Sequence, residues 1–322
     1  MAITRDGSRV PSVFLVKSGS NSDVLESPER DASVLPLFAM GLVVVVWGIA
    51  PPISKLITAS PLVSTFIRFG VSMPVFLLLL AVRGRWLSVS IFRSTALPGL
   101  CFGFNLIFVF AAVQQTTISL LSTVMATQPA LLLLLAAPLF DERPSIRQLY
   151  FTLVGIGGAI IVVLGAGGDL GTSIVGLGYA GLSMVTFTAY FVLTRLARTG
   201  EEVDPIEWMA GINIWAFLAT VVPALVILDR SDWAEFGGRD WLWILIIAFV
   251  TGIFGHVLMT WVHGHMEVAR SSLYNLAMHL VAVGLAWPLH DEPITATQAF
   301  GGVVLLGSVA LVISAPSRPR AQ

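Results

Sequence analysis

The chain has 322 residues, of which 56% are hydrophobic and only 11% are charged, and its mean hydropathy is +0.87. A soluble domain has about 25% charged residues, so this composition favours an integral membrane protein over one with a large soluble core. The net charge of −1 gives no indication of a nucleic-acid partner. Because Cys101 is the one cysteine, an intrachain disulfide and a thiolate metal cluster are excluded.

The N-terminal segment, from Met1 to about Ala32, is mostly polar and carries charges of both signs. Its apolar run VPSVFLV is too short for the core of a secretory signal peptide. We therefore expect residues 1–33 to form a flexible cytoplasmic tail.

Ten mainly apolar runs follow, each close to the ~20 residues that a helix needs to cross a bilayer. The connections between them are too short to hold a second soluble domain. The sequence therefore predicts an all-α integral membrane protein with ten transmembrane helices and a short C-terminal tail at 316–322. The predicted spans are roughly 34–55, 61–82, 96–115, 118–140, 148–167, 174–195, 206–228, 241–262, 268–289 and 295–315.

Lysine and arginine predict the orientation of these spans. With a cytoplasmic N-terminus, 14 of the 18 basic residues fall in inside segments. Lys55, Arg230 and Arg239 fall in outside loops, and Arg68 lies within a span. This bias predicts a multi-pass protein of the plasma or inner membrane with both termini in the cytoplasm.

Two short polar interruptions recur in the apolar sequence. The stretch AAPLFDERPSIRQ at 136–148 and the stretch LAWPLHDEPITATQ at 285–298 place Pro, Leu, Asp and Glu 150 positions apart. They follow the fourth and ninth spans, which predicts two copies of a five-helix unit, at 34–167 and 174–315. An odd number of helices per copy inverts the second copy in the membrane. Inverted repeats are common in secondary transporters, which place the substrate at the repeat interface.

Each interruption also has a local interpretation. Residues 145–148 and 295–298 both match the S/T-x-x-Q pattern of a capping box, which starts the next helix. The acidic pair before each box then lies in a turn at the membrane edge, where water solvates it. The alternative is a gating or ion-coupling role for Glu142 or Glu292.

Several stretches share a known family pattern. The first three spans contain VVWGIAPPISK with Trp47, the pair Arg68-Phe69, and GFNLIFVFAAV, while the fourth and ninth end in DERPS and DEPIT. Together with the two five-helix repeats, these stretches resemble the EamA-domain branch of the drug/metabolite transporter superfamily, over about 34–315. The resemblance implies a carrier of small organic metabolites or drugs, with export as the family tendency.

Some positions depart from that pattern. The family's proline midway along each fourth helix is kept as Pro129, but His279 stands at the equivalent position of the second copy, preceded by Met278 where glutamate is frequent. Asp141 and Asp291 replace the glycine before the signature glutamate. We expect specificity to depend on the difference between Pro129 and His279.

Polar and aromatic residues within the spans are candidates for substrate binding. All 19 acidic residues lie in tails, loops or span edges, which disfavours a carboxylate relay for ion coupling. Two alternatives remain: proton binding by histidine, which titrates near physiological pH, and a carrier that simply equilibrates or exchanges its substrate. The predicted substrate-binding residues are Trp47, Arg68, Asn105, Gln128, Tyr190, Asn213, His256 and His279.

Each candidate also has a structural alternative. Arg68 could attract an anionic substrate group or extend its long stem to the outer surface. The amides and histidines could bond across helix interfaces, and the aromatic residues could be packing residues or interface anchors. The prolines at 51–52 and 129 predict kinks, and Gly99-x-x-x-Gly103 predicts close helix packing.

The leading hypothesis is a secondary transporter, working as an exporter by alternating access. Its expected partners are a small-molecule substrate, the lipid bilayer and protons as a candidate coupling ion, with no nucleic acid, and it acts as a monomer or homodimer. An intramembrane enzyme is the second hypothesis, but the string around Ser183 lacks the last glycine of G-x-S-G and no H-E-x-x-H is present. A channel or scaffold is the third, without any sequence resembling a charged ring or carbonyl filter. We predict no enzyme activity, metal or cofactor.

Overall fold

The regular secondary structure of the described residues is helical. The computed structural model describes residues 34–128, 145–165, 170–198, 203–265 and 277–313, together with Leu131 and Leu135. Helices lie within each of the ten predicted spans, which confirms the predicted all-α membrane protein. The predicted tails, Pro129 and Glu142 lie outside the described residues. All contacts given below belong to the unit Leu35–Gln322.

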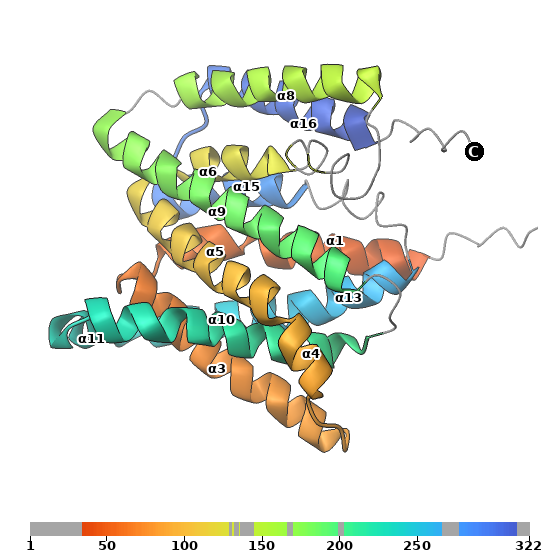
Figure 1. The fold of residues 1–322 in the computed structure, drawn as a ribbon. Helices are drawn as coiled ribbons and strands as arrows, with labels where there is room; N and C mark the ends of the chain where they lie inside the picture. The colour runs from red at the N-terminus through yellow and green to blue at the C-terminus, as the bar shows by residue number, and fades with distance from the viewer. Residues whose placement is uncertain are drawn as a thin grey trace, which may run out of the picture. The chain divides into compact units, whose positions relative to one another are not determined.

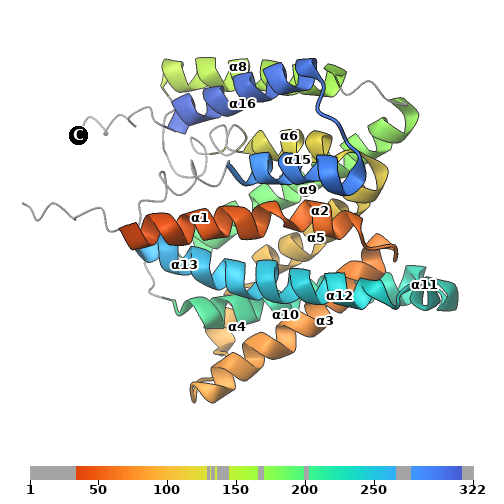
Figure 2. The same cartoon turned by 180° about the vertical axis from the view of Figure 1, so that it is seen from behind.

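The two halves of the chain each contribute a run of helices (Figure 1, Figure 2). The first half contains α1 (Val34–Gly48), α2 (Ala50–Lys55), α3 (Pro61–Val82), α4 (Val89–Ser94), α5 (Ala96–Gln115), α6 (Ile118–Ala126) and α8 (Ile146–Gly165). The second half contains α9 (Leu170–Arg198), α10 (Pro205–Ile227), α11 (Arg230–Glu235), α12 (Arg239–Ile246), the π-helix η1 (Ile247–Phe254), α13 (Gly255–His265), α15 (Ala277–His290) and α16 (Ala296–Ile313).

Six helical stretches among the described residues are long and apolar enough to cross a membrane: Leu35–Lys55, Pro61–Val82, Ala96–Gln115, Ile174–Thr194, Pro205–Ile227 and Arg239–Met259. Shorter apolar helices lie in the fifth, ninth and tenth predicted spans. Large apolar side chains project outward from several helices, with Leu78, Leu225 and Val303 exposed at 62%, 81% and 72%. Such a surface suits lipid contact, because apolar side chains gain nothing from facing water.

Local sequence determines where individual helices begin. Ser60 caps α3, because its side chain accepts a hydrogen bond from the backbone N–H of Val63. At the start of α16, Thr295 Oγ1 accepts from the backbone N–H of Gln298, and Gln298 Oε1 accepts from that of Thr295. The predicted capping box at 295–298 is therefore confirmed, whereas the side chain of Gln148 in the other box lies outside the described part.

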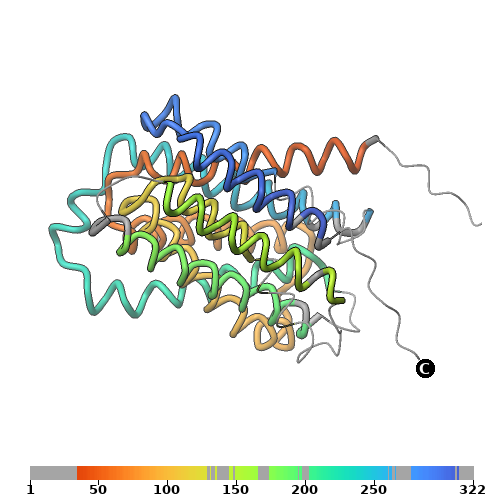
Figure 3. The backbone as a smooth tube through the Cα atoms, turned by 90° about the horizontal axis from the view of Figure 1, so that it is seen from above, coloured from red at the N-terminus to blue at the C-terminus, as the bar shows by residue number. Residues whose placement is uncertain are grey.

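The helices pack in neighbouring pairs. α8 runs beside α16 and α5 beside α9, and α10 contacts both α3 and α5 (Figure 3). A Cβ atom on Gly99 would lie 2.6 Å from Trp215 Cβ, and one on Gly103 would lie 2.7 Å from the Ala216 carbonyl oxygen. The predicted close packing at Gly99-x-x-x-Gly103 is confirmed, because only residues without side chains let α5 approach α10 this closely. A helix of the first half thus contacts a helix of the second half directly.

Candidate substrate site

A π-helix interrupts the eighth span, where the sequence predicted one regular helix. The backbone N–H of Gly255 donates to the carbonyl of Val250, so the carbonyl of Thr251 loses the donor that it would have in an α-helix. Trp47 of α1 directs its indole N–H at this oxygen, 3.3 Å away. Trp47 therefore donates to the carbonyl of Thr251 in place of the backbone N–H of Gly255. This hydrogen bond joins the first span to the eighth.

The residues around this contact allow the close approach of α1. A Cβ atom on Gly255 would lie 2.5 Å from Trp47 Nε1, so glycine is needed there. The next residue, His256, places its ring 5.0 Å from the Trp47 ring, with the two planes 55° apart. The indole of Trp47 thus lies between the π-helix backbone and an imidazole.

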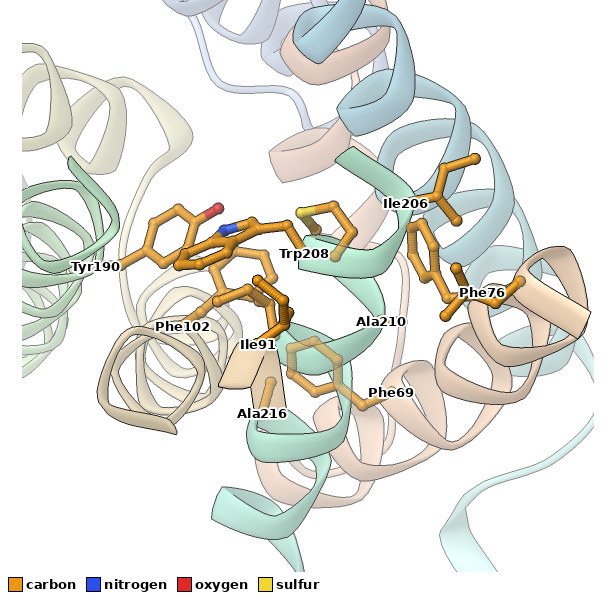
Figure 4. Close-up of a cluster of buried hydrophobic side chains, with 12 residues drawn as sticks. Phe69, Phe76, Ile91, Phe102, Tyr190, Ile206, Trp208, Ala210 and Ala216 are labelled. Atoms are coloured by element: carbon orange, nitrogen blue, oxygen red, sulfur yellow. The ribbon is translucent and has the colours of Figure 1, made fainter. Parts of the chain in front are cut away.

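Phe102 of α5 extends this pair into a larger group. Its ring meets His256 edge-on at 5.6 Å and lies 4.9 Å from the ring of Tyr190 on α9. Figure 4 shows Phe102 and Tyr190 within one buried group that also contains Trp208. We call Trp47, Phe102, Tyr190 and His256 the aromatic cluster. Its members come from both halves of the chain, two from each.

Arg68 of α3 lies at the edge of the aromatic cluster. Its Cζ lies 5.3 Å from the centre of the Phe69 ring, and that ring lies 5.7 Å from Phe102. Its Nη2 is only 3.3 Å from where a Cβ atom of Gly252 would stand, so the guanidinium lies against η1. The side chain is 5% exposed, and it is therefore buried instead of extended to the surface. Its Nε and Nη1 have no hydrogen-bond partner among the described residues.

Two predicted amides form bonds between helices. Asn105 Nδ2 donates to the carbonyl and the hydroxyl oxygen of Ser183, at 2.9 and 2.8 Å. Asn213 Oδ1 accepts from the hydroxyl of Ser72 at 2.7 Å. Both amides are buried and engaged with protein, as the structural alternative predicts. The Ser183 hydroxyl faces an amide, which gives the enzyme hypothesis no base in the described contacts.

Gln128 and His279 lie apart from the ring contacts of the aromatic cluster. Gln128 has a buried Nε2 with no hydrogen-bond partner in the described part of the chain. His279 is half-buried on α15, and the neighbouring Met278 and Val281 pack against Gly48 of α1. Of the eight predicted residues, the structure brings together Trp47, Arg68, Tyr190 and His256.

The sequence prediction missed Phe102 and the two glycines of the site. Phe102 stands in a run of aromatic and small residues, so its type alone carries no signal. A glycine beside a histidine within an apolar span, as at 255–256, marks a close backbone approach and was available as a signal.

Charged side chains contact one another at one end of the helices. We call this end, which contains Lys55, the Lys55 end. Lys55 Nζ lies 2.5 Å from Glu292 Oε1 and donates to the carbonyl of Thr116 at 2.8 Å. Glu292 Oε2 accepts from the backbone N–H of Ile118, at the start of α6, at 2.7 Å. His290 Nε2 lies 2.8 Å from the carbonyl oxygen of Pro52, to which it must donate because a carbonyl only accepts. The end of the first span and the start of α6 are thus joined to the α15–α16 turn.

A second carboxylate strengthens this end. Asp240, at the start of α12, is buried and accepts from the backbone N–H and the hydroxyl of Thr58, both at 3.0 Å. The sequence prediction considered Glu292 as a gating residue but did not name Lys55 as its partner. Their shared assignment to the outside was the available signal.

Charged contacts also join the two halves at the other end, which we call the Arg85 end. Arg85 Nη1 lies 2.6 Å from Asp204 Oδ2, and Glu207 accepts from the backbone N–H of Ser88 at 2.9 Å. Asp204 also caps α10, since its Oδ1 accepts from the backbone of Ile206 and Glu207. Arg85 is 51% exposed, so water screens this pair more than the pair at the Lys55 end.

Comparison with known proteins identifies the family. A model of the EamA-like transporter family matches residues 35–164 and 174–314. The chain belongs to the EamA-like transporter family. One matched range lies in each half of the chain. Together with the long apolar helices, this family membership makes the chain a multi-pass membrane protein.

Two relatives add to this result. The protein named uncharacterized transporter sll1319, from Synechocystis sp., is 29% identical over 220 residues, which are 64% of this chain and 64% of that protein. A crystal structure of another protein aligns with a TM-score of 0.60 at 18% identity, over 86% of this chain and 96% of the other. The second likeness is one of fold.

Proposed function

We propose that the protein is a secondary transporter that exports small organic metabolites or drugs by alternating access. The aromatic cluster carries this proposal, because Trp47 and Phe102 of the first half meet Tyr190 and His256 of the second. A site shared between two repeats changes shape when one repeat rocks against the other. Aromatic rings also provide the apolar walls that organic substrates need.

Reconstituted transport tests this function. Proteoliposomes loaded with a candidate metabolite, chosen by comparing metabolite levels in cells with and without the gene, should show saturable counterflow of the labelled compound. Uptake that never saturates, or single-channel currents, would contradict a carrier and favour a channel.

The two repeats, at 34–167 and 174–315, are proposed to be inverted, with both termini in the cytoplasm of a cell whose plasma or inner membrane holds the protein. In this orientation the Lys55 end faces outward. Since Cys101 is the one cysteine, Cys101→Ser provides a background for single-cysteine labelling. Trp86 and Glu235 are both exposed, at opposite predicted sides. An impermeant maleimide should label Glu235→Cys in intact cells and Trp86→Cys only after lysis. Labelling of both from one side would contradict inversion.

The Lys55 end is proposed to be the closed outer side of the transport cycle. Its contacts join the first span and the start of α6 to the α15–α16 turn, so outward opening requires Lys55 and Glu292 to separate. Water that enters on opening solvates both charges, which makes the contact reversible.

Protons are proposed as the coupling ion, with a histidine as the acceptor. His279 is half-buried on α15, and His256 faces Trp47 and Phe102 with Arg68 nearby across η1. Counterflow measured at two pH values should differ in the wild type, and His279→Ala should remove that difference. An unchanged pH response in this variant would exclude His279 as the acceptor.

A further inference from the structure

Arg68 is a cation buried among apolar neighbours. A guanidinium stays charged inside a protein, and a buried charge is strongly unfavourable unless it is paired. Among the described residues, no carboxylate oxygen lies within 4.0 Å of the Arg68 guanidinium, and its Nε and Nη1 have no hydrogen-bond partner. Two of its three nitrogens therefore have unused donors inside the protein.

Three basic residues at the ends of the helices have acidic partners. Lys55 pairs with Glu292, and both Arg83 and Arg85 pair with Asp204. These cations have acids beside them, although water already reaches them. An ionisable residue inside the membrane region that lacks such a partner indicates a functional site.

The surroundings of Arg68 define what could pair with it. Phe69 lies beside the guanidinium, Phe102 follows at ring-contact distance, and Gly252 brings the backbone of η1 against Nη2 without a side chain. The contacts on these sides are aromatic or backbone, with no acidic group among them. A ligand that completes the site would therefore present an anionic group to Arg68 and a flat apolar body to the aromatic cluster.

We infer that Arg68 recognises a carboxylate group, and that the substrates are organic carboxylates with a flat apolar body. Guanidinium groups bind carboxylates through charge-assisted hydrogen bonds that are shorter and stronger than neutral ones. This inference rests on the proposed function, since it names the substrate class of the same site.

The test uses the purified full-length protein and three probes of nearly equal shape: benzoate, neutral benzamide and cationic benzylamine. Benzoate should raise the melting temperature of the wild type and should exchange in proteoliposomes, with benzamide binding at least about tenfold more weakly, as expected for the loss of a charged hydrogen bond. Arg68→Gln should remove the preference for benzoate, while Arg68→Lys should retain part of it. Arg85→Gln, which changes an exposed arginine at a helix end, is the matched control and should keep the wild-type preference.

The melting temperature without ligand separates recognition from a structural role. If Arg68 is unpaired in the empty protein, Arg68→Gln removes a buried charge and should leave the melting temperature unchanged or raise it. A large decrease would indicate that Arg68 supports the fold, and it would overturn the inference.

The remaining outcomes separate the inference from the proposed function. Exchange of benzamide or benzylamine with no response to benzoate would keep the transporter and remove the anion site. Benzoate binding that depends on Arg68, without exchange, would keep the anion site and remove transport. Neither binding nor exchange of any probe would overturn the inferred substrate class, and the counterflow of metabolites would then decide the transport function separately.

Discussion

The cations at two ends of the helices and the cation in the interior differ in whether an acid lies beside them. At the ends, Lys55 lies against Glu292 and Arg85 against Asp204, so cations and acids from the two halves of the chain are paired. In the interior, Arg68 is 5% exposed and has two nitrogens without a hydrogen-bond partner among the described residues. The paired charges join the two halves of the chain, whereas the buried guanidinium is the group that we propose binds a ligand.

The two ends also differ from each other. The side chains of Lys55 and Glu292 are 24% and 10% exposed, whereas those of Arg85 and Asp204 are 51% and 15% exposed. A less exposed pair is screened less by water and salt. The Lys55 end should therefore contribute more to holding the halves together, and variants there should have the larger effects.

The largest effect is expected from Glu292→Lys, which places two amines together and leaves the backbone N–H of Ile118 without its acceptor. We expect this variant to lose about 2 kcal/mol of stability, the typical cost of removing a partly buried charged hydrogen bond. Counterflow should fall, because the Lys55 end can no longer close. The double variant Lys55→Glu with Glu292→Lys restores opposite charges and should recover part of both losses. No recovery in the double variant would indicate that backbone contacts, and not the charge pair, close this end.

A smaller effect is expected where the interior depends on close packing. Gly255→Ala places a Cβ atom 2.5 Å from Trp47 Nε1, which should displace the indole from the Thr251 carbonyl and destabilise the protein by about 1–2 kcal/mol. Thermal melting and substrate affinity should both decrease. Gly284→Ala is the matched control, because a Cβ atom at Gly284 would have no described atom within 4 Å beyond its own stretch of helix backbone and its chain neighbours. Equal losses in the two variants would show that helix propensity or general folding, and not Trp47, accounts for the change.

A neutral pair in the interior should contribute less. Asn105→Leu removes both hydrogen bonds to Ser183, and bonds of this kind between membrane helices contribute about 0.6 kcal/mol on average. A double-mutant cycle with Ser183→Ala measures the coupling between the two side chains. We expect a small positive coupling and unchanged preference for anionic substrates. A change in substrate preference would assign Asn105 to the substrate site instead.

The smallest effect is expected at the Arg85 end. Asp204→Asn removes the charge that faces Arg85 but keeps a side chain that can cap α10. The loss should stay below about 1 kcal/mol, as for exposed ion pairs, and it should vanish at high salt. A loss comparable to that of Glu292→Lys would contradict the ranking of the two ends.

Some residues of the site could be predicted from their residue type alone. Trp47, Tyr190 and His256 were predicted as single residues within apolar spans, and the structure places them in one cluster with Phe102. Asn105 was predicted on the same grounds but bonds to a neighbouring helix. Residue type shows that a polar group in a span needs a partner, but it does not show whether that partner is protein or substrate, since both satisfy the same hydrogen bond.

The sequence by itself determined the positions of the helices and several of their ends. A bilayer requires long apolar segments, and capping depends on side chains a few residues apart, so the spans and the box at 295–298 could be predicted from local sequence. Only the tertiary structure decided the π-helix, the burial of Arg68 away from any acid among the described residues, and the pairing of Lys55 with Glu292, which are 237 positions apart. These features depend on which helices pack together, and on the balance between hydrogen bonds within a helix and contacts between helices.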